Sequence, residues 1–317
     1  MSGPALPGPA DAPGPADADG LALSLLERCT FPSPGSPVDL AVSGGADSLA
    51  LLVLAARAGC RPTVHHVDHG LRAASRSEAG VVEAAARRFG AGFVPLRVEV
   101  APGPNLEARA RAARYAVLPP DVATGHTADD QAETILINLL RGAGLRGLSG
   151  MEPGRRHPIL RLRRSETTAL CEAYGLEPVV DESNADPSIL RNRVRAELVP
   201  FLSELARRDV VPVLTRQAGL LRAEDALLER LALGIDPTDA GALEALDPVL
   251  ARRAVRAWLR SGEGERHPPD AAAVERVLSV ARKEARACDV PGARRVRRSR
   301  GRLVLEQPPR EAEPPPK

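Results

Sequence analysis

The feature that most constrains this chain is a short glycine-containing loop, Ser43-Gly44-Gly45-Ala46-Asp47-Ser48, between an apolar run and a helical pattern. Val38, Leu40 and Val42 alternate as in a buried strand, and the segment from Asp47 to Arg57 has the pattern of a helix. Adjacent glycines remove side chains at a point where backbone N–H groups and the positive end of a helix converge. The sequence therefore predicts that this loop binds a phosphate.

Other kinds of glycine-rich loop have different requirements. A Walker-type NTPase loop needs a lysine that is absent here, so that interpretation fails. A G-x-G-x-x-G occurs at Gly142–Gly147, but it follows a helical pattern and not a strand, which argues against a dinucleotide site. An ordinary strand-to-helix turn, with Asp47 or Ser48 capping the helix, is the remaining structural alternative. The complete S-G-G-x-D-S pattern after the first strand favours the phosphate.

Strand and helix patterns alternate along most of the chain, which predicts an α/β fold with a parallel sheet flanked by helices. The last of these strands is expected over Glu177–Ser183 and a long amphipathic helix over Ser188–Arg208. From about Val213 the strands stop, and patterns rich in Ala, Leu and Arg indicate a smaller, mainly helical domain, with a hairpin turning near Ser299–Gly301. The expected organisation is a disordered extension (1–35), the α/β domain (36–212), the helical domain (213–305) and a disordered tail (306–317).

Composition excludes several classes of protein. The formal net charge is only +2, so a nucleic-acid partner would have to be held by a local basic patch. The 4 cysteines are far apart and form no Cys-x-x-Cys, which argues against a disulfide framework, a zinc ribbon and a dithiol redox centre. The N-terminal stretch lacks a basic start and an apolar core, and no run reaches membrane-spanning length. We therefore expect a cytoplasmic protein that does not enter a membrane.

The loop resembles the signature of the PP-loop ATP pyrophosphatases, which cut ATP between the α and β phosphates and use the adenylyl group to activate an oxygen. Further motifs follow it in a fixed order, and the set resembles the tRNA(Ile)-lysidine synthetase family over roughly residues 38–205. They are HVDHGLR (His66–Arg72), ARAARY (Ala110–Tyr115), GHTADDQAET (Gly125–Thr134), RGAGLRGLSGM (Arg141–Met151) and SNADPSILRNRVRAELVP (Ser183–Pro200). The C-terminal helices resemble the substrate-binding domain of that family.

The resemblance implies an adenine nucleotide alpha hydrolase-like fold and a ligase that uses ATP and Mg²⁺. Its partners would be free L-lysine and the isoleucine tRNA with a CAU anticodon. The carbonyl of the wobble cytosine would be adenylated first, and the lysine ε-amine would then displace AMP to give lysidine. A homodimer is an arrangement that the resemblance allows.

The resemblance also gives roles to individual residues. The expected catalytic residues are Asp47, Arg111, Asp130 and Glu133. ATP is expected at Ser43, Gly44, Gly45, Ala46, Asp47, Ser48, Asp68 and His69, with Asp47 also holding Mg²⁺. The lysine site comprises His126, Asp130 and Glu133, and the tRNA-binding residues are Arg114, Arg191, Asn192, Arg195, Arg295, Arg297 and Arg298.

Each of these motifs also has a purely structural interpretation. The histidines of HHVDH alternate along a strand, so they cannot converge on one metal ion. Arg111 and Arg114 could be a solvated helix face, with Glu107 pairing Arg111. Thr127 could cap a helix with Asp130 completing the capping box. The basic helix and the C-terminal arginine run could be ordinary surface.

Three other functions remain as alternatives. A tRNA-thiolating enzyme with this loop would need a sulfur-handling pair of cysteines, which the spacing does not provide. A non-enzymatic nucleotide-binding module would explain the loop, but it would not require the acidic motif or the basic helix. A small-molecule ligase, such as a synthetase for NAD or GMP, would lack a tRNA-facing part.

Overall fold

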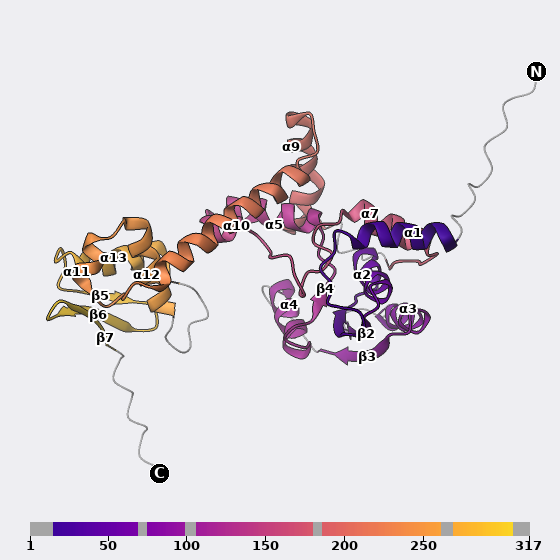
Figure 1. Ribbon diagram of the computed structural model, residues 1–317, viewed down its shortest axis with the longest axis horizontal. Coiled ribbons are helices and arrows are strands. Elements are labelled where there is room, and N and C mark those ends of the chain that lie inside the picture. Colours follow the sequence, from indigo (N-terminus) through magenta and orange to yellow (C-terminus); the bar gives the residue numbers. More distant parts are fainter. Residues whose placement is uncertain (1–14, 69–74, 99–105, 180–185, 261–268, 307–317) are drawn as a thin grey trace, which may run out of the picture. The chain divides into compact units, whose positions relative to one another are not determined.

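The computed structural model describes residues 15–68, 75–98, 106–179, 186–260 and 269–306. The chain divides into two compact units, Met1–Leu220 and Leu221–Lys317, which we call the first and second unit. The division lies between Leu220 and Leu221, inside helix α10 (Val211–Leu233, labelled in Figure 1), whereas the sequence predicts a boundary after residue 212, near the start of that helix. No helix in the described part of the chain combines the length and apolarity needed to cross a bilayer.

The first unit is built on a parallel sheet, as the alternating pattern predicts. In the described residues its strand order is β3-β2-β1-β4, and every pairing is parallel. The strands are β1 (Pro37–Ala41), β2 (Arg61–Asp68), β3 (Gly92–Arg97) and β4 (Ala123–Thr124), linked through α2 (Ala46–Arg57), α3 (Ser75–Arg88) and α4 (Leu106–Val117). The Ser43–Ser48 loop follows β1, and His126 follows β4, so both begin at the carboxyl edge of the sheet, where α/β proteins bind ligands.

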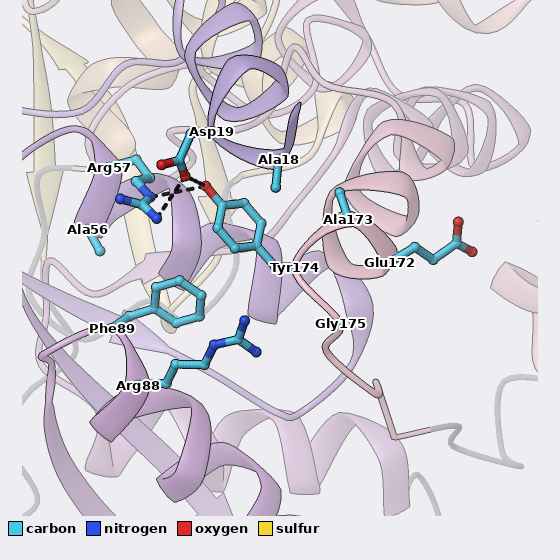
Figure 2. Close-up of a pocket in the computed structure, with 10 residues that line it drawn as sticks. All are labelled: Ala18, Asp19, Ala56, Arg57, Arg88, Phe89, Glu172, Ala173, Tyr174 and Gly175. Carbon is cyan, nitrogen blue, oxygen red and sulfur yellow. Dashed lines mark hydrogen bonds and ion pairs between the residues drawn. The ribbon is translucent and has the colours of Figure 1, made fainter. Parts of the chain in front are cut away.

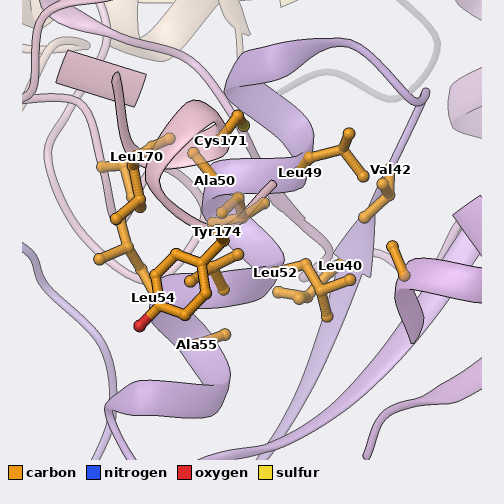
Figure 3. Close-up of a cluster of buried hydrophobic side chains, with 14 of the residues drawn as sticks. Leu40, Val42, Leu49, Ala50, Leu52, Leu54, Ala55, Leu170, Cys171 and Tyr174 are labelled. Atoms are coloured by element: carbon orange, nitrogen blue, oxygen red, sulfur yellow. The ribbon is translucent and has the colours of Figure 1, made fainter. Parts of the chain in front are cut away.

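Helix α2 forms the centre of the core of the first unit. Its residues from Ser48 to Ala55 are all buried, because the sequence is apolar around the whole circumference of the helix. Figure 3 shows Leu170, Cys171 and Tyr174, at the end of α7 (Arg164–Ala173), packed with the side chains of α2. This packing fixes α7, whose first residue reaches the candidate site described below.

Helix α1 (Pro15–Leu26) corrects the prediction that residues 1–35 are a disordered extension. Ala18, Ala22 and Leu25 are buried in the core, at spacings that place them on one helix face. Helices α1 and α7 pack side by side (Figure 1), and the guanidinium of Arg28 donates two hydrogen bonds to Glu166, at 3.1 and 2.5 Å. The sequence pattern did not predict this helix, because two of the three residues in its narrow apolar stripe are alanines within a Pro-, Gly- and Ala-rich segment.

The predicted long helix over residues 188–208 is interrupted. It consists of α8 (Leu190–Arg193), a π-helical turn η2 (Val194–Leu198) and α9 (Val199–Ala206). Pro200, in the first turn of α9, has no N–H and its ring crowds the carbonyl of residue 196, so regular α-helical hydrogen bonding fails there. The remaining helices of the first unit are α5 (Ala128–Leu140) and α6 (Leu145–Leu148).

The expected strand at Glu177–Ser183 does not form in its described part, Glu177–Val179. The N–H of Val179 donates instead to the carbonyl of Gly44, at 3.0 Å, so this segment lies against the Ser43–Ser48 loop. Residues 180–185 lie outside the described residues.

The second unit contains helices and a small antiparallel sheet. Helices α11 (Ala240–Ala245) and α13 (Ala271–Ala281) pack on the sheet β5 (Ala287–Val290), β6 (Arg294–Ser299) and β7 (Arg302–Glu306), and α12 (Pro248–Arg260) packs against α13. The predicted hairpin is confirmed, because Ser299 pairs with Arg302 across the turn. The sheet has a further strand, β5, which the sequence pattern did not predict.

Candidate active site

The Ser43–Ser48 loop is held by its own last residue. The hydroxyl of Ser48 accepts hydrogen bonds from the N–H groups of Ser43 and Gly44, both at 3.2 Å, and donates to the carbonyl of Gly45 at 2.8 Å. Gly44 has a φ of +97°, and a Cβ added there would lie 3.2 Å from Val179, so only glycine fits without strain. Gly45 is the N-cap of α2 and no side chain caps the helix, contrary to the ordinary-turn alternative. An uncapped helix start suits a phosphate.

Asp47 points from this loop towards α7. Its carboxylate accepts a hydrogen bond from the hydroxyl of Thr167 and another from Nε of Arg164, the latter at 3.3 Å. Burial raises the pKa of Asp47 above its usual value, although both of these partners favour the charged form.

Two more carboxylates approach from α5. Asp130 completes the capping box with Thr127 at the start of the helix, so the structural interpretation of this motif is correct. One oxygen of Asp130 accepts from the N–H and hydroxyl of Thr127, both at 2.9 Å, and the other lies 3.0 Å from Nη2 of Arg164. Glu133 lies one turn further on, and its side chain is 2% exposed. We call Asp47, Asp130 and Glu133 the acid cluster.

Arg164, the first residue of α7, contacts every member of the acid cluster. Its guanidinium lies 3.3 Å from Asp47, 3.0 Å from Asp130 and 3.2 Å from Glu133. Sequence reasoning missed this residue. A signal was present, because an arginine in the first turn of a helix opposes the helix dipole and so needs another reason to be there.

The basic helix also reaches the acid cluster. Nε of Arg191 lies 2.8 Å from Glu133, and Arg195 donates two hydrogen bonds to the same carboxylate, at 2.7 and 3.2 Å. Both are expected to bind tRNA, and in the structure both contact the acid cluster, with about a third of each side chain exposed. The amide of Asn192, on the same helix, donates to the carbonyl of Asp186 at 2.9 Å.

His126 lies beside this cluster as a neutral group. Its Nδ1 is 2.6 Å from the hydroxyl of Thr124, which is also 2.9 Å from Nδ1 of His157. Burial lowers the pKa of His126 to about 4, and the charges of Arg191 and Arg111 add to the effect despite the opposing charge of Asp130. His157, which the sequence did not single out, packs edge-on against His126.

The other site residues that the sequence predicts in the first unit are not members of the acid cluster. Arg111 and Arg114 lie over the ring of Tyr115, at 5.1 and 5.5 Å from its centroid, and burial lowers the pKa of Arg114. Asp68 ends β2 at the carboxyl edge of the sheet, and His69 lies outside the described residues. Nε2 of His65 lies 2.8 Å from Asp39, whereas Nδ1 of His66 lies 2.9 Å from the carbonyl of Val42.

In the second unit, strand geometry separates the arginines that were expected to act together. Arg295 and Arg297 are exposed on one face of β6. Arg298 points to the other face, where it donates to the carbonyl of Ala281 at the end of α13. The three residues therefore cannot present one continuous surface to tRNA, because neighbouring strand residues alternate in direction.

The first unit also has a depression of about 580 Å³ at the other end of α2 (Figure 2). Arg57 there pairs with Asp19 at 2.7 Å and hydrogen-bonds Tyr174 at 3.0 Å, while Arg88 lies over the ring of Phe89. Ten residues of helix separate Ala46 from Ala56, a rise of about 15 Å. The depression is therefore distinct from the acid cluster, and both arginines have a structural role at helix C-termini.

Comparison with known proteins gives a consistent result. Residues 23–202 match a family model described as the PP-loop domain, and residues 239–304 match one described as the TilS substrate binding domain. The tRNA(Ile)-lysidine synthase of Salinispora tropica is 40% identical over 87% of this chain and 92% of that protein. The enzyme of the same name from Nocardia farcinica is 38% identical over 87% of this chain and 93% of its own length.

A more distant similarity exists among solved structures. The U34-tRNA thiolase NcsA from Methanococcus maripaludis aligns with a TM-score of 0.48 and 16% identity, over 65% of this chain and 79% of that one. That level of similarity says nothing about substrate.

Proposed function

The chain belongs to the tRNA(Ile)-lysidine synthase family, and on that premise we propose that it ligates L-lysine to the wobble cytidine of the isoleucine tRNA with a CAU anticodon. ATP supplies the adenylyl group that activates the cytosine carbonyl, and the lysine ε-amine displaces AMP in the second step. The observation that carries the proposal is the meeting of the Ser43–Ser48 loop with Asp130 and Glu133 at Arg164.

ATP is proposed to bind with its phosphates at the Ser43–Ser48 loop and the start of α2, as the local geometry favours. Asp68 ends the neighbouring strand β2, and we propose that it and the next residue, His69, contact the same nucleotide. The residues present fit Mg²⁺, because Asp47 offers a carboxylate that is 23% exposed, and Mg²⁺ is commonly held by one or two carboxylates plus substrate phosphates. When bound, the ion would neutralise the departing pyrophosphate.

Lysine is proposed to bind beside Asp130, whose carboxylate provides charge for an ammonium group. Arg191 and Arg195 are partly exposed and offer guanidinium donors to the lysine carboxylate. His126 can contribute hydrogen bonds but no charge, because burial holds its pKa at about 4. Glu133 contacts lysine only if an arginine gives way, and otherwise acts by holding Arg191 and Arg195 in place.

The tRNA is proposed to contact Arg111 and Arg114 in the first unit and Arg295 and Arg297 in the second. Arg111 could also act in catalysis, since its charge already influences His126. In the part of α10 that belongs to the second unit, Leu227 and Leu231 are 48% and 52% exposed and lie one helical turn apart. We propose that this apolar patch pairs with a second copy of the chain, in the cytoplasm.

The test is to incubate the protein with ATP, Mg²⁺ and radiolabelled lysine, with and without the tRNA, and to measure label in tRNA and release of AMP. Asp47→Asn should abolish tRNA-dependent AMP formation and leave the fold intact, because no core volume changes. Lysine-independent AMP transfer to a small molecule would instead indicate a ligase of another class. A thiolating enzyme is disfavoured, since burial raises the pKa of Cys29 and Cys171 to about 12.

A further inference from the structure

Arg164 is placed where two proposed subsites meet. Asp47 belongs to the ATP loop, and Asp130 belongs to the proposed lysine site. One guanidinium bridges them, with Nε 3.3 Å from Asp47 and Nη2 3.0 Å from Asp130. It therefore occupies the positions in which a cation would lie against both carboxylates.

The backbone of Arg164 is held independently of its side chain. Its N–H donates to Asp129 at 2.8 Å, and the same carboxylate accepts from Arg163 at 3.1 and 3.0 Å. Arg163 also donates to Asp209. The start of α7 is therefore anchored, and the guanidinium of Arg164 can change partners by side-chain rotation alone.

Cation binding at these carboxylates requires such a change. The acid cluster carries three negative charges when ionised, and Arg164, Arg191 and Arg195 carry three positive charges. Mg²⁺ at Asp47, or a lysine ammonium at Asp130, would take a carboxylate oxygen that Arg164 now contacts. Since a guanidinium directly beside another cation in a partly buried place is costly, Arg164 should turn away when a cation binds either carboxylate.

The contacts indicate which arginine leaves. Arg195 binds Glu133 through two hydrogen bonds, and Arg191 binds it at 2.8 Å. Arg164 makes one contact with each acid, at 3.0 to 3.3 Å, and its side chain is 28% exposed. Among the described residues, Arg164 is the arginine of the three that also contacts Asp47, whereas Arg191 and Arg195 contact Glu133 and Asp130. A cation that binds Asp47 therefore has to displace Arg164, whichever arginine is held most tightly.

We propose that Arg164 is an internal competitor for the substrate cations, an inference that rests on the proposed function. Its guanidinium neutralises Asp47 and Asp130 in the ligand-free protein and is displaced when Mg²⁺ and the lysine ammonium bind. Because one side chain bridges both carboxylates, displacement from Asp47 weakens its hold on Asp130. Nucleotide binding should therefore favour lysine binding, and by linkage the reverse should hold.

The experiment measures the Kd of L-lysine by calorimetry, with and without MgCl₂ and a non-hydrolysable ATP analogue. For the wild type, the analogue should tighten lysine binding by roughly fivefold or more. Arg164→Ala should bind lysine roughly five- to tenfold tighter than the wild type when no nucleotide is present, because the competing state is gone. The effect of the analogue should then largely disappear. Arg164→Lys, whose compact ammonium cannot bridge both acids, should lie between the two.

Arg28→Ala is the matched control, because Arg28 anchors the same helix through Glu166 and does not contact the acid cluster. It should leave the Kd of lysine unchanged. Weaker lysine binding by Arg164→Ala would overturn the inference and show that the guanidinium contacts the ligand directly. Absence of lysine binding in both proteins would also overturn it. Lysine binding with the predicted change but no lysidine formation on tRNA would support the competitor and reject only the proposed function.

Discussion

Replacing Glu133 with glutamine tests whether the buried carboxylate holds the three arginines together. Glu133 accepts four hydrogen bonds from Arg164, Arg191 and Arg195, at 2.7 to 3.2 Å. A glutamine fits the same space and keeps one carbonyl acceptor. Its amide NH₂ group would face two guanidinium donors in place of an oxygen, so about half of the contacts are lost and the charge is removed.

The magnitude follows from those losses. Each charged donor left without its partner costs about 1–2 kcal/mol here, because the arginines are about one-third exposed and can turn partly to water. The expected cost is therefore about 3 kcal/mol of unfolding free energy. For a unit of this size that corresponds to a fall in Tm of roughly 6–12 °C.

The assay is thermal unfolding followed by circular dichroism, with Glu166→Gln as the control. Glu166 pairs with Arg28 at a more exposed position, so the same substitution there should cost less than about 1 kcal/mol. In single-turnover reactions, Glu133→Gln should slow lysine transfer more than adenylation, so adenylated tRNA should accumulate. An unchanged Tm would refute the anchoring role of Glu133. An equal fall in the rates of adenylation and lysine transfer would indicate that Glu133 acts on the nucleotide.

Three further outcomes are expected. Leu25→Ala should lower the unfolding free energy by about 2–5 kcal/mol, because α1 is part of the core. A change near zero in urea titrations would show that α1 does not contribute to the core, as the sequence prediction of a disordered extension had it. The double variant Arg295→Ala, Arg297→Ala should reduce the slope of the logarithm of tRNA affinity against the logarithm of salt concentration by about 1.5, whereas Arg298→Ala should leave this slope unchanged. Equal slopes for all variants would show that β6 does not contact the tRNA backbone. Burial alone would raise the pKa of Asp130, but Arg164 and Thr127 outweigh it, so the folded pKa lies below the unfolded value. The stabilisation of the fold by ionised Asp130 should therefore be complete above about pH 4 and should be lost as the pH falls further. When unfolding free energy is measured against pH, Asp130→Asn should lose less stability below about pH 4 than the wild type does.

Sequence alone determined the features that depend on neighbours along the chain. The Ser43–Ser48 loop, the parallel strands and the capping box at Thr127 each follow from local periodicity or from a few adjacent residues. The ordered motifs also placed Asp47, Asp130 and Glu133 near the carboxyl edge of the sheet, because parallel strands share that edge.

Only the tertiary structure decided which charges meet. Arg164 lies 117 residues from Asp47 in the chain and 31 from Glu133, so no local pattern could pair them. The same limit explains why the contacts of Arg191 and Arg195 with Glu133 were not predicted, because a basic helix has the same sequence pattern whether it faces solvent or buried acids. It also explains α1, whose alanines become core residues only when α7 and α2 cover them. Local sequence fixes the conformation of each segment, but burial and charge pairing depend on contacts between distant segments, and these decide what each side chain can do.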